Sequence, residues 1–433
     1  MTITIIGHGY VGLVTACVFA DFGNDVWVVG HTKEKIDKLK KGHPLIYEPG
    51  LAELLQKNLK SKRIHFGLDY QSVSKSDVVF ITVGTPPKVT GEADLSAVFD
   101  VARNIAKNLS ESKNHYTVVS CKSTVPVGTN KKVEVILKKH KPKNAKFAVA
   151  SCPEFLREGT GIYDTINADR VVIGSDSKKA IELLIEIHKP INGKRVITDL
   201  ASAELIKYIS NAMLATKISF SNLVSFYAEK ADADVEAVLD AVGLDKRIGR
   251  IFMSPGVGYG GSCLPKDVMA LIEVGKKLEI KSAFLDEVER INQLAKLNFL
   301  KKILDNSPGK NLAVWGLSFK PNTDDIRFAP SIFIIENLLK EGFNLTVYDP
   351  EAKNNIEKLL GNKIRYEINP YRCLKNAEAL IILTEWNEFK QIDLNKVKKL
   401  LKNPVIFDGR NIYPPQIMKK LGFKYFSVGR KAV

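Results

Sequence analysis

The stretch TITIIGHGYVG, residues 2–12, decides how the chain begins to fold. Residues 2–6 form an apolar run that predicts a buried strand, and an apolar helical pattern covers residues 13–22. The glycines between them, Gly7, Gly9 and Gly12, permit a tight turn and bring a pyrophosphate onto the N-terminus of the helix. A GxGxxG motif is specific only when it lies between a strand and a helix, as it does here. We therefore predict that the chain opens with a dinucleotide-binding βαβ unit.

The end of the second predicted strand, residues 26–29, departs from the usual dinucleotide pattern. An Asp or Glu normally stands there and binds the ribose hydroxyls of NAD. Here the sequence reads GHTK at residues 30–33, so Gly30 removes the carboxylate, while His31, Thr32 and Lys33 add hydrogen-bond donors. This is the change expected if the 2′-phosphate of NADP were accommodated. The alternative is that Gly30 only weakens the ribose contact and that NAD still binds.

Strand and helix patterns alternate through the rest of the first half of the chain. Apolar runs at residues 77–83, 116–121 and 147–151 predict buried parallel strands, and residues 171–174 predict one more. The three longer runs each end in polar or glycine-containing sequence. Because ligands of a doubly wound sheet bind at the carboxyl ends of its strands, these strand ends are expected to face one crevice.

A second α/β unit is predicted from about residue 310, with strands at residues 312–315 and 345–348. It ends its second strand with the acidic Asp349 but lacks a GxGxxG motif. The fold class is therefore α/β, with two Rossmann-like doubly wound domains joined by a long central helix. The predicted domains are residues 1–198, 199–308 and 309–433.

The predicted central helix covers residues 199–228, which contain no Gly or Pro. An apolar face is formed by Leu205, Ile206, Ile209, Met213 and Leu214. Lys207 and Asn211, four residues apart, share a face. We interpret this helix as a spine and a dimer contact. The alternative is a plain core helix with two exposed polar residues.

The stretch GYGGSCLPKD at residues 258–267 carries the strongest chemical signal. Its glycines allow positive φ and close approach of the backbone to a ligand, and they place Cys263 near Lys266 and Asp267. A neighbouring ammonium favours the nucleophilic thiolate. The alternative is a glycine-rich turn that ends in a buried structural cysteine.

Composition narrows the class of protein. The 433 residues carry a net charge of +16, but the lysines are scattered along amphipathic segments rather than gathered in a basic arm. This pattern suits solvated helix faces or an anionic substrate and argues against nucleic-acid binding. The five cysteines are widely spaced without a CxxC pair, which predicts a reduced, cytoplasmic protein. No metal site, signal peptide or membrane contact is predicted.

Taken in order, these motifs make the chain resemble the UDP-glucose/GDP-mannose dehydrogenase family nearly from end to end. The resemblance implies that the C6 alcohol of a nucleotide sugar is oxidised by two hydride transfers to NAD. UDP-glucose is the expected substrate, and GDP-mannose or a UDP-N-acetylhexosamine is the alternative. Besides the Lys207 and Asn211 pair, the stretches that carry the resemblance are GHGYVG at 7–12, IYEPGL at 46–51, VGTPP at 83–87, KSTVPVGT at 122–129, PEFLREG at 153–159, GYGGSCLPKD at 258–267, FKPNTDDIR at 319–327, YDP at 348–350, TEWNEF at 384–389 and FDGRNIY at 407–413.

The resemblance also implies roles for the matching residues. Cys263 would add to the aldehyde as a thiohemiacetal and carry the thioester that water hydrolyses, and Lys207 with Asn211 would stabilise the alkoxide. Asp267, Glu158 and Thr124 would position and deprotonate the water. The implied dinucleotide contacts, beyond the three glycines, are Tyr10, Val11, Gly30, His31, Thr32, Lys35, Gly84, Thr85, Thr124, Glu158, Lys266 and Arg327. The implied sugar-nucleotide contacts are Glu154, Phe155, Leu156, Arg157, Glu158, Lys207, Asn211, Phe252, Met253, Ser254, Pro255, Gly256, Tyr259, Gly260, Lys320 and Arg410, with Arg247 reaching the site of a partner subunit in a homodimer or higher homo-oligomer.

Three positions depart from the family pattern. Gly30 replaces the usual Asp, Cys152 stands where Asn is usual, and Leu264 follows the nucleophile where many UDP-glucose enzymes carry Phe and GDP-mannose relatives can carry Leu. Two other classes of protein remain open. A two-electron dehydrogenase of the 6-phosphogluconate or hydroxyacid type would have no use for Cys263, and the intact set of polar residues argues against a non-enzymatic NAD-binding regulator.

Overall fold

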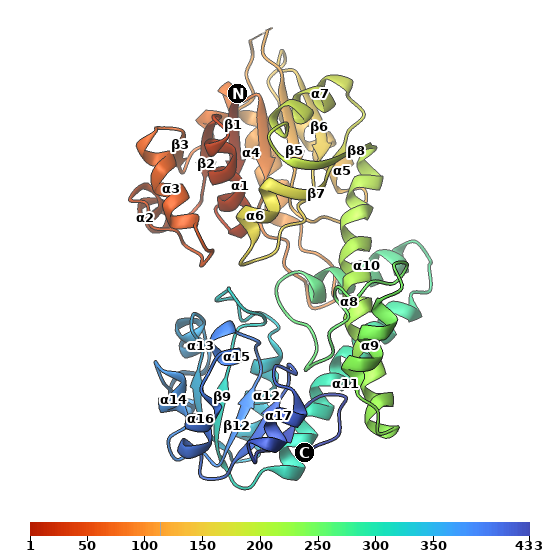
Figure 1. Cartoon of the computed structure of the whole chain (residues 1–433). Coiled ribbons are helices and arrows are strands. Elements are labelled where there is room, and N and C mark those ends of the chain that lie inside the picture. Colours follow the sequence, from red (N-terminus) through yellow and green to blue (C-terminus); the bar gives the residue numbers. More distant parts are fainter. Residues whose placement is uncertain (113) are drawn as a thin grey trace. The chain divides into compact units, whose positions relative to one another are not determined.

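The computed structural model describes residues 1–112 and 114–433 and divides into two compact units (Figure 1). The first unit contains Met1–Ser210 and Met269–Leu278, and the second contains Asn211–Val268 and Glu279–Val433. The predicted fold class is confirmed, because each unit is built on a largely parallel sheet and the long helix α8 (Leu200–Lys230) joins them. The division into three domains stays a prediction.

The first unit contains an eight-stranded sheet in the order β3-β2-β1-β4-β5-β6-β7-β8. All neighbouring strands are parallel except β6 and β7. The strand β8 was not predicted, because its sequence is polar and most of its side chains are partly exposed. The strands are β1 (Thr2–Ile6), β2 (Asp25–Val29), β3 (Ile64–Gly67), β4 (Val78–Ile81), β5 (Thr117–Cys121), β6 (Phe147–Ser151), β7 (Asn167–Gly174) and β8 (Asn192–Thr198).

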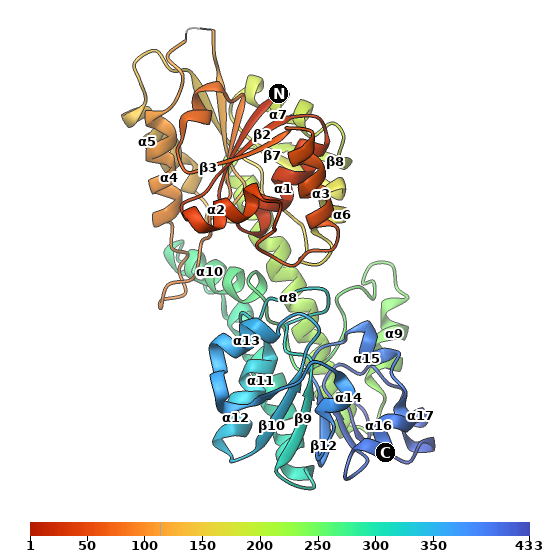
Figure 2. The same ribbon diagram turned by 90° about the vertical axis from the view of Figure 1, so that its left-hand side faces the viewer.

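Helices cover both faces of this sheet, which is why its central strands are mainly apolar and buried along nearly their whole length. Figure 2 shows α4 and α5 on one side and α1 and α3 on the other. Each face has its own apolar core, one around Phe19 and Phe80 and the other around Ile105 and Val119. The helices are α1 (Tyr10–Asp21), α2 (Lys33–Lys40), α3 (Leu51–Lys60), α4 (Ser96–Lys107), α5 (Thr129–His140), α6 (Gly161–Ile166) and α7 (Lys178–Ile187), with a 3-10 turn, η1 (Gln71–Lys75).

The second unit contains a six-stranded parallel sheet in the order β11-β10-β9-β12-β13-β14. Its strands are β9 (Asn311–Trp315), β10 (Asn344–Tyr348), β11 (Arg365–Tyr366), β12 (Ala379–Ile382), β13 (Val405–Asp408) and β14 (Lys424–Phe426). Its helices are α9 (Val235–Gly243), α11 (Ala283–Asn306), α12 (Pro330–Lys340), α13 (Lys353–Leu360), α14 (Pro370–Cys373), α15 (Asn387–Lys390), α16 (Leu394–Leu400) and α17 (Pro415–Lys420), with a 3-10 turn, η2 (Gly361–Lys363). The helix α10 (Leu264–Lys277) contributes residues to both units.

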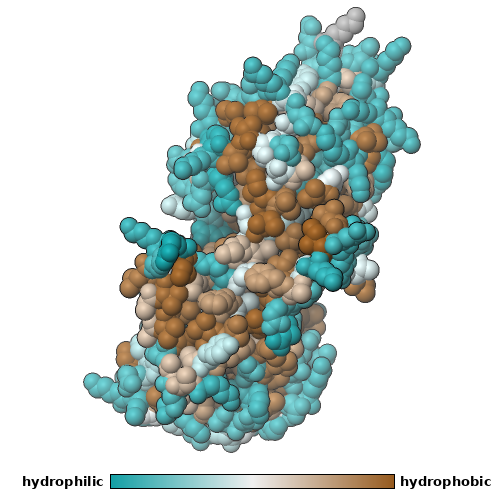
Figure 3. All heavy atoms as spheres, turned by 90° about the vertical axis from the view of Figure 1, so that its right-hand side faces the viewer, coloured by the Kyte–Doolittle hydropathy of each residue, from teal (hydrophilic) through white to brown (hydrophobic). Residues whose placement is uncertain are grey.

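The apolar face predicted for α8 is largely at the surface, although Ile206 and Leu214 are partly buried. Leu205, Ile209 and Met213 are 40%, 50% and 57% exposed, and Phe220 and Tyr227 farther along the helix are also exposed. Figure 3 shows the side of the molecule on which apolar side chains gather. Among the described residues, no helix is long and apolar enough to cross a membrane.

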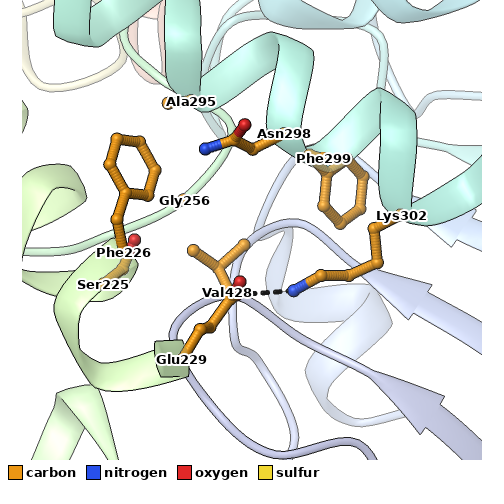
Figure 4. A pocket seen from close by; sticks show the side chains of 9 residues that line it. All are labelled: Ser225, Phe226, Glu229, Gly256, Ala295, Asn298, Phe299, Lys302 and Val428. Atoms are coloured by element: carbon orange, nitrogen blue, oxygen red, sulfur yellow. Dashed lines mark hydrogen bonds and ion pairs between the residues drawn. The ribbon is translucent and has the colours of Figure 1, made fainter. Parts of the chain in front are cut away.

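The C-terminal end of α8 is anchored within the second unit. Lys302 of α11 donates to Glu229 of α8 at 2.6 Å (Figure 4). It also donates to the carbonyl of Ser427 at 2.6 Å. The cavity beside this ion pair measures about 10 Å³ and has room for no more than one water molecule. These bonds therefore fix the C-terminal end of α8 to the second unit.

Candidate active site

The turn after β1 is shaped by close approach of backbone to backbone. Gly7 has φ of 123°, and a Cβ there would lie 2.8 Å from the hydroxyl of Thr82. A Cβ on Gly12 would collide with the carbonyl of Gly7, whereas one on Gly9 would meet no atom within 4 Å. Two of the glycines therefore pack the turn against β4, and Gly9 leaves open space at the N-terminus of α1. Such a cradle fits the pyrophosphate of a dinucleotide.

Tyr10 fixes this turn to two distant loops. Its hydroxyl donates to the buried carboxylate of Glu48, and the backbone N–H of Gly159 donates to Tyr10 Oη at 3.0 Å and to Glu48 Oε2 at 2.6 Å. Burial, followed by the bond to Glu48, raises the pKa of Tyr10 well above its ordinary value. Tyr10 thus remains a neutral donor. Sequence reasoning had quoted Glu48 within the IYEPGL stretch but assigned it no role.

The ends of β4 and β5 are bonded to one another. Ser123 Oγ donates to the carbonyl of Val83 at 2.7 Å, and Thr85 Oγ1 donates to the carbonyl of Thr124 at 2.9 Å. A Cβ on Gly84 would meet no atom within 4 Å. Gly84, Thr85 and Thr124, all predicted cofactor contacts, therefore lie together at the carboxyl edge of the first sheet, where ligands of such sheets bind.

A buried ion pair occupies the same unit. Lys207 Nζ lies 3.1 Å from Glu154 Oε1, and the two side chains are only 5% and 6% exposed. The ring of Phe155 lies 5.3 Å from Lys207 Nζ and also stacks on Arg170. Glu154 Oε2 accepts from the backbone N–H of Leu156 at 2.8 Å. Lys207 thus presents an ammonium that is held by a carboxylate and shielded from water.

Two residues of the PEFLREG region, Arg157 with a predicted role and Cys152 as a departure from the family pattern, are restricted by their surroundings. Arg157 is exposed and donates through its backbone and its guanidinium to Asp164 at the start of α6. Cys152, which replaces the family's usual Asn, is buried near Lys122, and burial raises the pKa of its thiol. A buried thiol of this kind is unreactive, so Cys152 is not a second nucleophile.

In the second unit, Cys263 stands at the N-terminal end of α10. Its carbonyl accepts from the backbone N–H of Asp267 at 2.9 Å, which is the first bond of the helix, and its side chain is exposed. The N-terminus of a helix stabilises negative charge. The thiol therefore occupies a position suited to an attacking thiolate, rather than the buried structural position that was the alternative.

Asp267 lies one turn farther along α10 and is almost fully buried. One of its oxygens accepts from the amide of Asn211 at 2.5 Å, and the other accepts from Lys266. Its side chain is 1% exposed. Asn211, Lys266 and Asp267, each predicted as a site residue, thus form one bonded cluster.

The glycine-rich loop before Cys263 packs against the protein itself. Gly258 and Gly261 have φ of 90° and 84°. Added Cβ atoms would lie 2.6 Å from the amide oxygen of Asn292 and 2.7 Å from the ring of Phe319, and one on Gly260 would collide with the carbonyl of Phe328. We had expected these glycines to bring the backbone close to a ligand. Their close approach is instead to α11 and to the turn after β9.

Several predicted sugar-nucleotide contacts have buried side chains. The hydroxyl of Tyr259 donates to Glu289 at 2.9 Å, and Met253 packs with Val235 and Leu239. Pro255 is also buried, whereas Phe252 is partly exposed and Ser254 is exposed. The backbone N–H of Gly256 donates to Asn222 at 2.8 Å. This segment is therefore held from inside by two asparagines, Asn222 and Asn292, which sequence reasoning did not single out.

Arg410 connects three segments of the second unit. Its guanidinium donates to the carbonyls of Leu383 at 2.9 Å, Gly258 at 3.3 Å and Phe319 at 3.3 Å. The ammonium of Lys320 lies 5.7 Å from the ring of Phe319. Both predicted cations thus lie beside the turn after β9. Arg327 and Arg247 are exposed and paired with Asp325 and Asp245.

The chain was compared with models of known protein families. Three family models match in sequence: an NAD binding domain at residues 1–192, a central domain at residues 201–294 and a UDP binding domain at residues 313–415. The chain belongs to the UDP-glucose/GDP-mannose dehydrogenase family. The first unit therefore holds the NAD-binding domain of that family, in agreement with the glycine cradle after β1, while use of NADP stays a prediction.

Individual members of the family are similar over the whole chain. UDP-glucose 6-dehydrogenase TuaD of Bacillus subtilis (strain 168) is 44% identical, with 100% of this chain and 94% of the relative covered. The structure of a UDP-glucose dehydrogenase from Pyrobaculum islandicum is 36% identical with a TM-score of 0.92, covering 99% and 98%. The structure of a UDP-D-ManNAc dehydrogenase from Pyrococcus horikoshii is 26% identical with a TM-score of 0.84, covering 99% of each chain. Within the described residues, no group of three His, Cys, Asp or Glu side chains could hold a metal ion.

Proposed function

We propose that this protein oxidises the C6 alcohol of UDP-glucose to UDP-glucuronate in two successive hydride transfers to NAD. The observation that carries the four-electron reaction is the exposed Cys263 at the N-terminus of α10, one helical turn from the buried Asp267. The choice of UDP-glucose is supported by full-length relatives that bear the name UDP-glucose 6-dehydrogenase at 44% and 43% identity.

Cys263 makes the second oxidation possible. An aldehyde has no hydride to give until a nucleophile has made its carbon tetrahedral. The Sγ atom adds to C6 of the aldehyde to form a thiohemiacetal. Loss of a hydride from C6, together with loss of the hydroxyl proton, then gives the thioester. Attack of water then breaks the C–S bond, which gives the carboxylate and restores the thiol. NAD bound to the first unit supplies the hydride acceptor in both oxidation steps.

Lys207 is the proposed donor to the alkoxide. Its ammonium is nearly excluded from water and held by Glu154, so it keeps one orientation. A preorganised donor in a site of low dielectric stabilises a developing oxyanion strongly. Asn211, one turn away on α8, is the proposed second donor.

Asp267 is proposed to position and deprotonate the water that hydrolyses the thioester. Its carboxylate is buried between Asn211 and Lys266, which fixes its orientation. Glu158 and Thr124 are proposed to assist, and both are partly buried near the strand ends of the first unit. Arg410 and Lys320 are proposed to bind the anionic nucleotide in the second unit.

The competing functions give different product counts. The proposed enzyme yields two NADH for each uronate, a two-electron dehydrogenase yields one, and a regulatory protein yields none. The test is to incubate the purified protein with UDP-glucose, GDP-mannose and a UDP-N-acetylhexosamine in separate reactions and to measure NADH and acid product together. A faster reaction with either of the other sugars would retain the chemistry but replace the substrate.

A homodimer built on α8 is also proposed. Leu205, Ile209, Met213, Phe220 and Tyr227 give this helix an exposed apolar surface of the kind that marks protein interfaces. Arg247 is proposed to reach the partner's site, so Arg247→Ala should lower activity without changing the assembly. Sedimentation should give a dimer, and a fully active monomer would contradict this part of the proposal. The cytoplasm is the proposed location.

A further inference from the structure

The end of β2 has no carboxylate, and it also has no space for a side chain at Gly30. A Cβ built on Gly30 would lie 2.6 Å from Ile36 Cδ1 and 2.8 Å from His8 Nδ1, distances that real Cβ atoms essentially never show. The backbone N–H of Gly30 is meanwhile paired with the carbonyl of Gly67. His8 and Ile36 thus fill the space that a strand-end side chain would need. The absence of an acidic residue is built into the surrounding packing.

His8 points an uncommitted nitrogen into this corner. It is the second residue of the GHGYVG turn and is only 7% exposed, and its Nδ1 is buried without a hydrogen-bond partner. Burial, then the neighbouring His31 and Lys35, lower the pKa of His8, so its ring is neutral and already lies in a positive field. Buried polar atoms in native proteins are rarely left unpaired, so this nitrogen is available for a hydrogen bond in the corner.

Most of the other side chains around this corner are hydrogen-bond donors. The ring of His31 lies 5.1 Å from that of His8. Thr32 is the N-cap of α2 but makes no capping hydrogen bond with its side chain, so its hydroxyl is not used by the helix. Lys35 follows in the first turn, while Lys33 is paired with Asp37 at 2.6 Å. Glu34 is the acidic residue in the first turn of α2. A helix N-terminus with nearby cations favours an anion.

We propose that His8, His31, Thr32 and Lys35 form a phosphate-accepting ribose corner, so that this protein discriminates only weakly against NADP relative to NAD, by no more than about thirtyfold. A carboxylate at the end of β2 would repel a 2′-phosphate and bind the two ribose hydroxyls instead. Here the corner offers imidazole, hydroxyl and ammonium groups, which pair well with a phosphate. The proposal rests on the dinucleotide site of the first unit and concerns only which dinucleotides that site accepts.

The geometry also determines how selectivity can be engineered. Gly30→Asp by itself forces the new side chain against His8 and Ile36, so it tests packing as much as charge. The double variant His8→Ala/Gly30→Asp removes the imidazole that occupies the space and supplies the missing carboxylate. It should favour NADH over NADPH by about tenfold or more relative to the unmodified protein, since it removes one donor and adds one repulsive charge.

The decisive experiment measures equilibrium binding of NADH and NADPH to the full chain by calorimetry, without sugar substrate. The two dissociation constants are expected to lie within about thirtyfold of each other. A carboxylate at the end of β2, which would repel the 2′-phosphate and lose its hydrogen bonds to the ribose, would cause a larger difference. Adenosine 2′,5′-bisphosphate and 5′-AMP provide the matched pair that isolates the 2′-phosphate. The bisphosphate should bind at least as tightly as 5′-AMP.

Variants locate the effect within the corner. His31→Ala and Lys35→Ala should weaken NADPH more than NADH, whereas Lys38→Ala, which removes the same charge from the last turn of α2, should weaken both equally. NADPH binding weaker than NADH binding by more than about thirtyfold would overturn the proposal. So would equal losses of both cofactors in His31→Ala and Lys35→Ala. Failure of both cofactors to bind would instead contradict the dinucleotide site itself.

Discussion

The two sheets share one strand order but differ in the residue at the end of their second strand. Counted along each unit, the first six strands follow the order 3-2-1-4-5-6 in both. Both turns after the first strand begin with a glycine in positive φ, Gly7 and Gly316, and each packs against a threonine at the end of the fourth strand, Thr82 and Thr384. The difference lies at the end of the second strand, where the first unit has Gly30 and the second has Asp349.

The carboxylate of Asp349 accepts its hydrogen bonds from the protein itself. It is 3% exposed, and its two oxygens accept hydrogen bonds from the groups that an anion would otherwise find at this sheet edge. Its donors are the backbone N–H groups of Leu317, Ser318, Glu351 and Ala352, the hydroxyl of Ser318 and the indole of Trp386. The acidic strand end of the second unit is therefore bonded to its own turn, whereas the strand end of the first unit carries no carboxylate and packs against His8 and Ile36.

The largest expected effect is on uronate formation, and it comes from a substitution in the second unit. Cys263→Ser should lower uronate formation by at least about a thousandfold, because an alcohol does not readily form and release the acyl intermediate. NADH binding, which belongs to the first unit, should stay unchanged. Product assays and calorimetry on the same preparation measure both. Normal steady-state turnover would show that Cys263 is not the nucleophile.

In the first unit, substitutions of Lys207 and Glu154 should separate an effect on turnover from an effect on stability. Lys207→Ala should lower kcat by about a hundredfold to a thousandfold, the usual loss for one oxyanion donor. It should also destabilise the fold, because Glu154 is left buried without its partner. Lys207→Ala/Glu154→Gln should recover stability but not turnover. A change confined to KM would reduce Lys207 to a binding residue.

The hydrogen bonds of Asp349 at the end of β10 can be disrupted by a single substitution. Asp349→Asn replaces one accepting oxygen by a donating amide that faces several N–H groups, and it should lower the free energy of unfolding by about 2–3 kcal/mol. Urea unfolding measures the loss. NADH affinity should not change, because the first unit has its own turn. Full stability of Asp349→Asn would remove the contrast between the two sheets.

Acid should weaken only the first unit through histidine, because all seven histidines lie in residues 1–188. His188 is buried between Phe19 and Phe80, and burial lowers its pKa to about 3. Since the unfolded chain takes up this proton more readily, the contribution is complete above about pH 6.5 and is lost as the pH falls toward 3. At pH 5 the loss is about 2 kcal/mol.

Hydrogen exchange at pH 7 and pH 5, resolved by segment, measures this difference between the units. The first unit should lose protection at pH 5 more than the second. His188→Gln, which cannot take up a proton, should remove the histidine part of the change. Equal losses in both units would assign the acid sensitivity to carboxylates instead.

Much of the architecture could be predicted because it is local. The apolar runs of β1, β4, β5 and β6 and the uninterrupted pattern of α8 specify their own structure. The strand β8 escaped prediction because it lies at a sheet edge and has few apolar side chains. The packing of α8 was also beyond the sequence, since an apolar face looks the same whether it meets a core or a partner chain.

The site was predictable in its residue types but not in its contacts. The spacing of Cys263, Lys266 and Asp267 indicated their chemistry, whereas the glycines before them gave no sign that their neighbours would be Asn292, Phe319 and Phe328. Those neighbours come from parts of the chain that no local pattern connects. His8 was hidden for the same reason: only the structure shows that it fills the space beside Gly30.

The bonds among Tyr10, Glu48 and Gly159 set an order for the synthesis of the chain. The glycine turn emerges from the ribosome first, but the N–H group that completes its bonding lies 149 residues later. Until that segment has been translated, the turn lacks one of its anchors, and closing so long a loop is slow compared with local folding. The first unit therefore cannot complete its fold during synthesis until a large part of the chain has emerged. A pause or a truncation before Gly159 would leave this turn without its last anchor and expose the growing chain to association with its neighbours.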